Sequence, residues 1–519
     1  MATASQAVSL TNGRLLARNT IWNLLGQILP MAVGLITIPL LVRGMGVERF
    51  GVLSLAWVVV GYFSLFDLGI GRALTKLVAD KLGANQEHAI PPLAWTSLAM
   101  MLLLGVFGAL VTLILSPWLV ERLLRIPQSL QSEALRGFYV LAASIPMVTA
   151  TAGLRGILDA LQRFRIANLI RIPMSVFSFV APLLVFPFSH SLVPIISVLV
   201  AGRLVGCLVH LLAALQAMPI LKQQVYVRTS LIMPALRLGG WMTVSNLVGP
   251  IMSYLDRFLI GAVLSIAAVS YYAAPADMMS RVLVIPTAIA GVLFPALALS
   301  LQQDKNRAEL IFSRGVKWMF LVIFPLTLLV VTLAPEGLRL WLGTTFSENG
   351  TPALRWLAAG TLLNCLAFVP FALLQAAGRP RVTGMLNLME LPLYLVALWF
   401  LVKTRGIEGA AIAWAGRVSV DAVLMYGFAH RLVTRMSNFL LRLAAGIAGA
   451  LSLLCVFVFL HGLTIKLFSL SICLVAFGLI GWFWILTPEE RKFFLGMGPV
   501  PAMIKFSAVL PQSDRMNAR

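Results

Sequence analysis

The stretch Thr20–Val42, TIWNLLGQILPMAVGLITIPLLV, decides the fold of this chain, and it contains no charged residue. A helix needs about 20 mostly apolar residues to cross the hydrocarbon core of a bilayer, which is about 30 Å thick, because each residue advances the helix by about 1.5 Å. Thr20–Val42 is long enough to cross as a helix. It is too long, and too uniformly apolar, for a barrel strand of about 10 residues.

Further apolar runs of similar length follow along the chain. Only 11% of the residues are charged, 60% are hydrophobic and the mean hydropathy is +0.93, whereas a soluble domain carries about 25% charged residues. In lipid, helices alone let so many separate runs satisfy their backbone groups. We therefore predict an all-α polytopic membrane protein with about fourteen transmembrane helices. The other expected spans are Gly51–Gly71, Pro91–Ser116, Ala134–Leu154, Arg171–His190, Leu192–Met218, Gly240–Ala262, Ser270–Leu297, Lys317–Trp341, Ala353–Ala376, Met385–Val402, Glu408–Leu432, Leu440–His461 and Lys466–Leu486.

The basic residues predict the orientation of the chain in its membrane. The net charge of +21 is spread over short loops, and it does not form the single basic domain typical of a nucleic-acid-binding protein. The loops on the N-terminal side carry about 26 Lys and Arg residues, and those on the other side about 7. The positive-inside rule then predicts that both termini are cytoplasmic.

Two pairs of short segments indicate an internal repeat. Asn23–Gly26 in the first run matches Asn246–Gly249 in the seventh, and Arg163–Ile166 before the fifth run matches Arg379–Val382 before the eleventh. After a three-residue shift, Arg171 corresponds to Glu390 and Pro173 to Pro392. Because six helices separate the copies, they keep the same membrane orientation, as in transporters built from two parallel halves.

The repeat predicts the domain organisation. An N-terminal lobe of six helices occupies residues 1–239, and a second parallel six-helix lobe occupies 240–439. Two C-terminal helices follow at 440–486, and 487–519 forms a cytoplasmic tail.

Ionisable side chains at bilayer depth are expensive and usually face a partner or a water-filled cavity. Arg257 lies about 9 Å, and Asp277 about 10 Å, from the outer ends of neighbouring runs, so a pair between them is expected. Asp277 with Arg281, and Arg417 with Asp421, also stand four residues apart on one helix face. The arginines inside runs are Arg203, Arg257, Arg281 and Arg417, and the acids are Asp67, Asp256, Asp277, Glu390 and Asp421.

Two interpretations of these charges stay open. They can form salt bridges that hold the bundles together, or they can line a hydrated cationic lumen between the two halves that receives an anionic substrate. Asp67 can be a helix-end cap or a coupling site. The sequence has no Walker-type phosphate loop and no metal-binding motif, so we expect neither ATP as the direct energy source nor a cofactor, a metal or an enzymatic activity.

Four segments resemble a known family. They are Asn19–Gly26 (NTIWNLLG), Leu41–Gly51 (LVRGMGVERFG), Phe66–Thr75 (FDLGIGRALT) and Leu255–Gly261 (LDRFLIG). Together they are similar to the Wzx-type polysaccharide flippases, the O-antigen and exopolysaccharide transporters of the multidrug/oligosaccharidyl-lipid/polysaccharide exporter superfamily. The resemblance covers nearly the whole chain, and its specificity comes from the order and placement of these loose motifs.

The resemblance implies a function in surface polysaccharide biosynthesis. Such proteins move an undecaprenyl-pyrophosphate-linked oligosaccharide across the bacterial inner membrane by alternating access, with membrane lipids, a polysaccharide polymerase and chain-length machinery as candidate partners. Asp67, Arg72, Asp256 and Arg257 are the site residues that the motifs imply. Arg203, Arg281 and Arg417 are added from depth alone, and Asp277 as the partner of Arg257.

Two alternatives of the same superfamily are a cation-coupled drug antiporter and a lipid II flippase. The deep arginines count against cationic drugs as substrates. A scaffold or a polymerase-type glycosyltransferase belongs to a different class. A polymerase of lipid-linked sugars would carry a long outer loop, and this chain has none.

Overall fold

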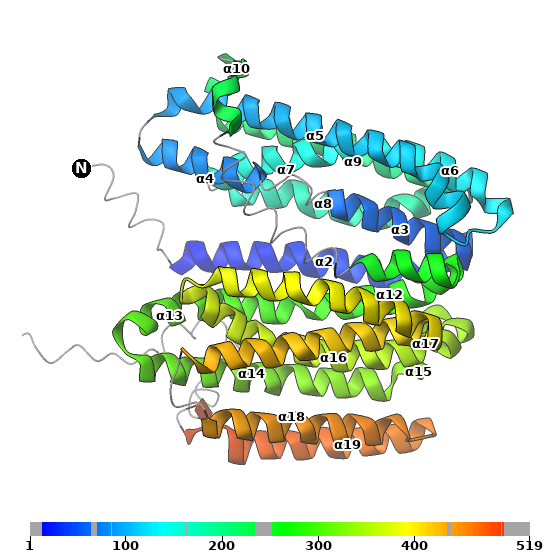
Figure 1. Ribbon diagram of the computed structural model, residues 1–519, viewed down its shortest axis with the longest axis vertical. Helices are drawn as coiled ribbons and strands as arrows, with labels where there is room; N and C mark the ends of the chain where they lie inside the picture. The colour runs from blue at the N-terminus through cyan, green and yellow to red at the C-terminus, as the bar shows by residue number, and fades with distance from the viewer. Residues whose placement is uncertain are drawn as a thin grey trace, which may run out of the picture. The chain divides into compact units, whose positions relative to one another are not determined.

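The computed structural model describes residues 13–491, except 64–69, 85, 162, 224, 234–251, 253, 433–436 and 489. Every regular element in this described part is a helix (Figure 1). Nine of the described helices are long and apolar enough to cross a membrane. The predicted all-α membrane fold is confirmed, whereas the count of fourteen spans stays a prediction.

The chain divides into two compact units, which are described separately. The larger unit is Asn23–Val458, and the smaller one consists of the chain segments outside that range.

The first half of the sequence supplies the helices α2 (Gly13–Met45), α3 (Val47–Phe63), α4 (Ile70–Gly83), η1 (Glu87–Ala89), α5 (Ile90–Trp118), η2 (Leu119–Leu123), α6 (Gln128–Ala142), α7 (Ile145–Ala160), α8 (Phe164–Val185), α9 (Leu192–Ala217), α10 (Ile220–Gln223) and η3 (Thr229–Leu231). The second half supplies α12 (Ile266–Val282), α13 (Val284–Gln303), α14 (Lys305–Thr332), α15 (Ala334–Leu342), α16 (Thr344–Ala376), α17 (Pro380–His430), α18 (Ser437–Val458), α19 (Leu463–Ile480) and η4 (Gly481–Ile485). Residues 254–263 are also helical.

Several predicted spans differ in detail from the observed helices. The fourth span is made of α6 and α7, because Pro146 has no backbone N–H to continue the ladder and suits the first turn of a new helix. The eleventh and twelfth spans are joined in α17, where Gly406 has φ 62° and ψ −140°. Glycine adopts this positive φ without a steric penalty, so the two spans follow each other with almost no loop.

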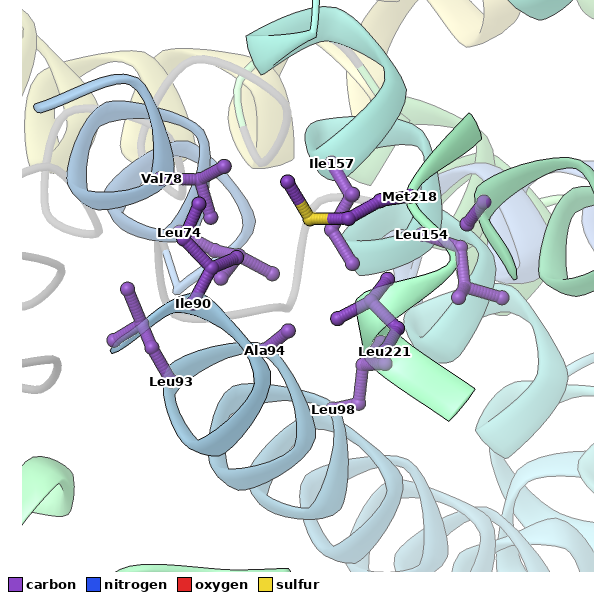
Figure 2. Packing of buried hydrophobic residues seen from close by; sticks show 11 residues of the cluster. Leu74, Val78, Ile90, Leu93, Ala94, Leu98, Leu154, Ile157, Met218 and Leu221 are labelled. Atoms are coloured by element: carbon purple, nitrogen blue, oxygen red, sulfur yellow. The ribbon is translucent and has the colours of Figure 1, made fainter. Parts of the chain in front are cut away.

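A hydrophobic cluster joins α4, α5, α7 and α10 at one end of the N-terminal helices. Figure 2 shows its side chains directed toward one another, with Leu74 on α4, Leu98 on α5 and Leu154 on α7. Trp95 Nε1 on α5 also donates a hydrogen bond to the carbonyl oxygen of Leu221 at 3.0 Å. Through Leu154 and Ala214 the cluster also holds α7 and α9, which carry Arg155, Arg203 and His210.

Glycine lets α5 and α7 approach closely. A Cβ atom added at Gly105 would lie 2.5 Å from Pro146 Cα, well inside ordinary van der Waals contact. Thr149 Oγ1 on α7 uses this closeness to donate a hydrogen bond to the carbonyl oxygen of Met101 on α5 at 2.9 Å. Close approach over small residues is a general source of helix association in membranes.

The outward faces of several helices are apolar. Exposed side chains on α5 include Leu103, Phe107 and Ile114, and those on α17 include Leu393 and Val396. Contiguous exposed apolar surface of this kind marks contact with an apolar environment. The exposed faces therefore agree with helices that contact lipid.

We predict that Gly105→Ala lowers the stability of the folded chain. The new methyl group meets backbone atoms of α7 that cannot rotate away, and overpacking of this kind costs about 1–3 kcal/mol. Thermal unfolding in detergent, followed by size-exclusion chromatography, measures the change. The control is Gly446→Ala on α18, where an added Cβ meets nothing within 4 Å. Equal unfolding temperatures for both variants would contradict the proposed close packing.

Candidate functional site

Arg257 lies in the helical segment 254–263 and is paired with an acid on α12. Its Nη2 atom donates a hydrogen bond to Asp277 Oδ1 at 2.5 Å. Only 5% of the Arg257 surface is exposed. The pairing expected from the equal depths of the two residues is confirmed.

Asp256, beside Arg257, belongs to the same cluster. Its Oδ2 atom accepts a hydrogen bond from the Tyr272 hydroxyl at 2.6 Å, and its Oδ1 atom accepts one from the Arg257 backbone N–H at 2.8 Å. The cluster thus holds two carboxylates and one guanidinium, all carried by two neighbouring helices. An incoming anion would have to displace Asp277 before it could use the same guanidinium nitrogen of Arg257.

Arg417 and its partners form a second cluster within α17. Arg417 Nη1 lies 3.6 Å from Glu390 Oε2; the Glu390 side chain is buried and the Arg417 side chain is mostly buried. Asp421 is close enough to interact electrostatically with both. The Arg417 guanidinium also lies 5.6 Å from the centre of the Tyr394 ring. Arg417 therefore has an acidic partner on the preceding span in addition to Asp421.

Arg281 on α12 has an aromatic partner on the N-terminal helices. Its guanidinium lies 5.7 Å from the centre of the Phe179 ring on α8, within the range of a cation–π attraction. Phe179 in turn meets Trp57 of α3 edge to face, with the ring centres 5.5 Å apart. Arg281 thus connects helices from the two predicted lobes.

Arg203 on α9 lines a cavity of about 290 Å³ among α7, α8 and α9. Two further arginines, Arg155 on α7 and Arg171 on α8, line the same cavity, as does His210 on α9. The cavity is therefore strongly basic. Arg155 forms an ion pair with Asp159 at 3.5 Å.

The remaining predicted residues lie wholly or partly outside the described residues. Asp67 falls in the gap 64–69. Arg72 is in α4, but the structure does not describe its side chain. Of the described site residues, Arg257, Asp256 and Asp277 are brought together, whereas Arg203, Arg281 and Arg417 each have a different set of partners.

The sequence analysis gave no role to Arg155, because it lies near the end of a predicted span, or to His210, because it is a lone histidine. A sequence signal for the correspondence between Arg203 and Arg417 exists. Both arginines end an Ala-Gly-Arg triplet, at Ala201–Arg203 and 214 residues later at Ala415–Arg417. No group of three His, Cys, Asp or Glu side chains in the described part of the chain is placed to hold a metal ion.

Comparison with known proteins gives the family. Residues 16–300 match the family model described as "Polysaccharide biosynthesis protein". The chain is 30% identical over 433 residues to a Shigella flexneri protein named "Putative O-antigen transporter", covering 81% of this chain and 99% of that protein. It is also 23% identical over 185 residues to a Haloferax volcanii protein named "Probable low-salt glycan biosynthesis flippase Agl15", covering 36% of this chain and 39% of that protein.

Solved structures give the same fold. A multidrug-resistance transporter of the MATE family and MOP superfamily, in an inward-facing conformation, matches with a TM-score of 0.70 at 17% identity and covers 79% of this chain and 96% of its own. A MOP superfamily transporter from Pyrococcus furiosus, whose binding pocket has reversed polarity, matches with a TM-score of 0.58 at 17% identity, over 80% of this chain and 95% of its own.

These matches confirm the resemblance drawn from the sequence motifs. They cover helices of both predicted lobes, and the relatives are transporters rather than enzymes. The chain is therefore a multi-pass membrane transporter that belongs to the polysaccharide biosynthesis protein family.

Proposed function

We propose that this protein is a flippase that moves an undecaprenyl-pyrophosphate-linked oligosaccharide across the bacterial inner membrane for surface polysaccharide biosynthesis. The observation that carries the proposal is the 30% identity with the Shigella flexneri protein, which extends over 99% of that protein. The basic side chains that line the α7–α8–α9 cavity support it, because arginine suits phosphate groups.

The proposed mechanism is alternating access between two lobes, 1–239 and 240–439, through a cationic lumen. The positions of the helix ends support the two-lobe organisation. α7 ends at Ala160 and α16 at Ala376, and α8 begins at Phe164 and α17 at Pro380, so both boundaries repeat after 216 residues. Alternating access by one repeat moving against the other is the general mechanism of transporters built in this way.

The charged clusters suit such a mechanism in different ways. Arg281 stacks on Phe179 and so joins the two proposed lobes by a contact that can break without leaving an acid unpaired. Arg257 and Asp277 hold two adjacent helices together inside the second lobe. We assign Arg257 to the path of the substrate, where phosphate can compete with the partly exposed Asp277 carboxylate.

Reconstitution tests the proposed function. Proteoliposomes would carry a polyprenyl-diphosphate-linked oligosaccharide with a fluorescent label, and a membrane-impermeant glycosidase would report its arrival in the outer leaflet. About half of the labelled oligosaccharide lies in the outer leaflet at the start and is open to the glycosidase. We expect the glycosidase to cleave more than this half as the protein moves further substrate outward. Absence of translocation together with efflux of a cationic dye would instead support the drug antiporter alternative. Translocation of lipid II in place of the oligosaccharide would support the lipid II flippase.

We predict that Arg257→Ala abolishes surface polysaccharide while the protein still inserts into the membrane. The variant removes the cation and leaves the buried Asp256 and the partly exposed Asp277 without it. Complementation of a flippase-deficient bacterium, with immunoblotting of the membrane fraction, measures both properties. Normal polysaccharide would exclude Arg257 from the substrate path.

A charge-swapped variant separates binding from packing. Arg257→Asp with Asp277→Arg restores the ion pair but exchanges the positions of the two charges. Under our proposal the swap inserts stably and still exports no polysaccharide. Recovery of export by the swap would assign Arg257 to holding the two helices together.

We predict that the termini and the basic loops lie in the cytoplasm. Single cysteines in a variant without the native cysteines would test this, at the exposed positions Ser129 in a predicted outer loop and Asn306 in a predicted inner loop. A membrane-impermeant maleimide should label Ser129→Cys in intact cells and Asn306→Cys only after permeabilisation. Labelling of Asn306→Cys in intact cells would reverse the topology.

A further inference from the structure

The cavity among α7, α8 and α9 is turned away from the lipid-facing surface of α9. Arg203, Gly206 and His210 lie on one face of this helix and line the cavity. The exposed apolar residues of α9, which include Leu204 and Leu208, lie on other faces. Arg203 therefore belongs to the face of α9 that lines the cavity and not to its exposed apolar faces.

Two glycines shape the cavity. A Cβ atom at Gly202 would lie 2.7 Å from Phe177 Cδ1, and one at Gly206 would lie 3.2 Å from Met174 Sδ. The side chains of α8 therefore pack directly on the backbone of α9. This close packing brings Arg171 on α8 and Arg203 on α9 to the same cavity.

The basic groups in the cavity exceed the acidic ones. Asp159 forms an ion pair with Arg155 and also interacts electrostatically with Arg171. Among the described residues, no carboxylate lies within ion-pair distance of Arg171 or Arg203. A buried arginine without a counter-charge is unfavourable unless an anion or water supplies one. One carboxylate thus stands near three guanidinium groups, and the cavity keeps a net positive charge.

His210 adds a group that can respond to an anion. Its Nδ1 atom lies 2.8 Å from the carbonyl oxygen of Gly206. Because a carbonyl oxygen only accepts, Nδ1 carries the proton and donates. Nε2 is then the nitrogen that can take up a second proton and donate a hydrogen bond into the cavity.

In the second lobe, the positions that correspond to Arg203 and Arg171 hold an arginine and an acid, so the protein itself supplies the counter-charge. Arg417 corresponds to Arg203 through the Ala-Gly-Arg triplets, and Glu390 corresponds to Arg171. In the second lobe these positions form the Arg417–Glu390 ion pair at 3.6 Å. In the first lobe they place two arginines around one cavity. In each lobe the two corresponding positions therefore belong to one local environment, an ion pair in the second lobe and a cavity in the first.

One further position strengthens the contrast. At the same offset as the triplets, Cys207 corresponds to Asp421. The second lobe thus surrounds its arginine with two carboxylates, whereas the first lobe has an arginine and a thiol at those positions. The corresponding spans thus have more carboxylates than arginines in one lobe and only arginines in the other.

We propose that the α7–α8–α9 cavity binds the diphosphate group of an anionic ligand, with Arg171 and Arg203 as the principal contacts. Two guanidinium groups match a diphosphate diester, which carries one negative charge on each phosphate, and arginine binds phosphate oxygens with paired N–H donors. The cavity has several times the roughly 30 Å³ of one water molecule, so hydrated phosphates fit. The proposal rests on the proposed function, which supplies a lipid-linked diphosphate.

The predicted topology gives this site a place in transport. Arg155 and Arg171 belong to the loop and helix ends that the positive-inside rule assigns to the cytoplasm. A diphosphate bound here is captured from the leaflet in which the substrate starts. The cavity is therefore a loading site, distinct from the Arg257 cluster.

The key variant is Arg171→Glu, which gives the first lobe the acid found in the second. Because the introduced carboxylate is a new partner for Arg203, this variant should fold with an unfolding temperature equal to or above that of the wild type. We expect its affinity for inorganic pyrophosphate and for geranylgeranyl diphosphate to fall at least tenfold. Arg203→Gln should lose affinity by a similar factor, and Arg171→Lys should retain most of it. The control is Arg165→Gln, an exposed residue on the same helix.

Calorimetric titration of the full-length protein in nanodiscs of zwitterionic lipid measures these affinities. Unchanged affinity in Arg171→Glu and Arg203→Gln, or no binding by the wild type, would overturn the proposal. Native mass spectrometry in discs with phosphatidylglycerol identifies the other source of phosphate. The cavity would be a phospholipid site if the wild type retained that lipid, Arg171→Glu lost it, and pyrophosphate did not displace it. That result would overturn the diphosphate assignment.

The translocation assay separates this inference from the proposed function. If pyrophosphate binding depends on Arg171 but the wild type translocates no substrate, the cavity site is supported and the flippase proposal is overturned. Translocation by Arg171→Glu at the wild-type rate would leave the flippase standing and overturn the loading site.

Discussion

The absence of water from the bilayer core is the constraint on which the rest of this structure depends. Backbone groups that cross the bilayer must pair within the protein, which is why the apolar runs form helices. The same constraint applies to the charged side chains, because a lone charge in an apolar medium is strongly unfavourable. The positions of the arginines and of their partners therefore carry information about function that the apolar residues do not.

The arginines meet this constraint in three ways. Arg257 and Arg417 have carboxylate partners on adjacent spans. Arg281 lies over an aromatic ring. Arg203 shares a cavity with two more arginines, of which only Arg155 has an ion-pair partner among the described residues. The first arrangement pairs the charge with a carboxylate, the second places it over an aromatic ring, and the third leaves it without an ion-pair partner among the described residues at Arg171 and Arg203.

The two predicted lobes have corresponding helix ends and corresponding Ala-Gly-Arg triplets, but they differ in charge around the arginine of the triplet. Glu390 in place of Arg171, and Asp421 in place of Cys207, change the charge at corresponding positions of these spans. In the proposed mechanism both lobes move against each other, but only one of them has to bind the diphosphate group of the substrate when transport begins. A difference in charge between the lobes suits such a mechanism.

The sequence by itself determined the helical membrane fold, because run length and the bilayer thickness leave few other structures. It also determined the family through its ordered motifs, and it predicted the Arg257–Asp277 pair, because depth along a helix follows from the rise per residue. Only the tertiary structure decided which helix faces meet. It placed the helix break before Pro146 and the junction at Gly406. The aromatic partner of Arg281 and the cavity that joins Arg155, Arg171 and Arg203 depend on close packing between helices, which hydrophobic run length does not encode.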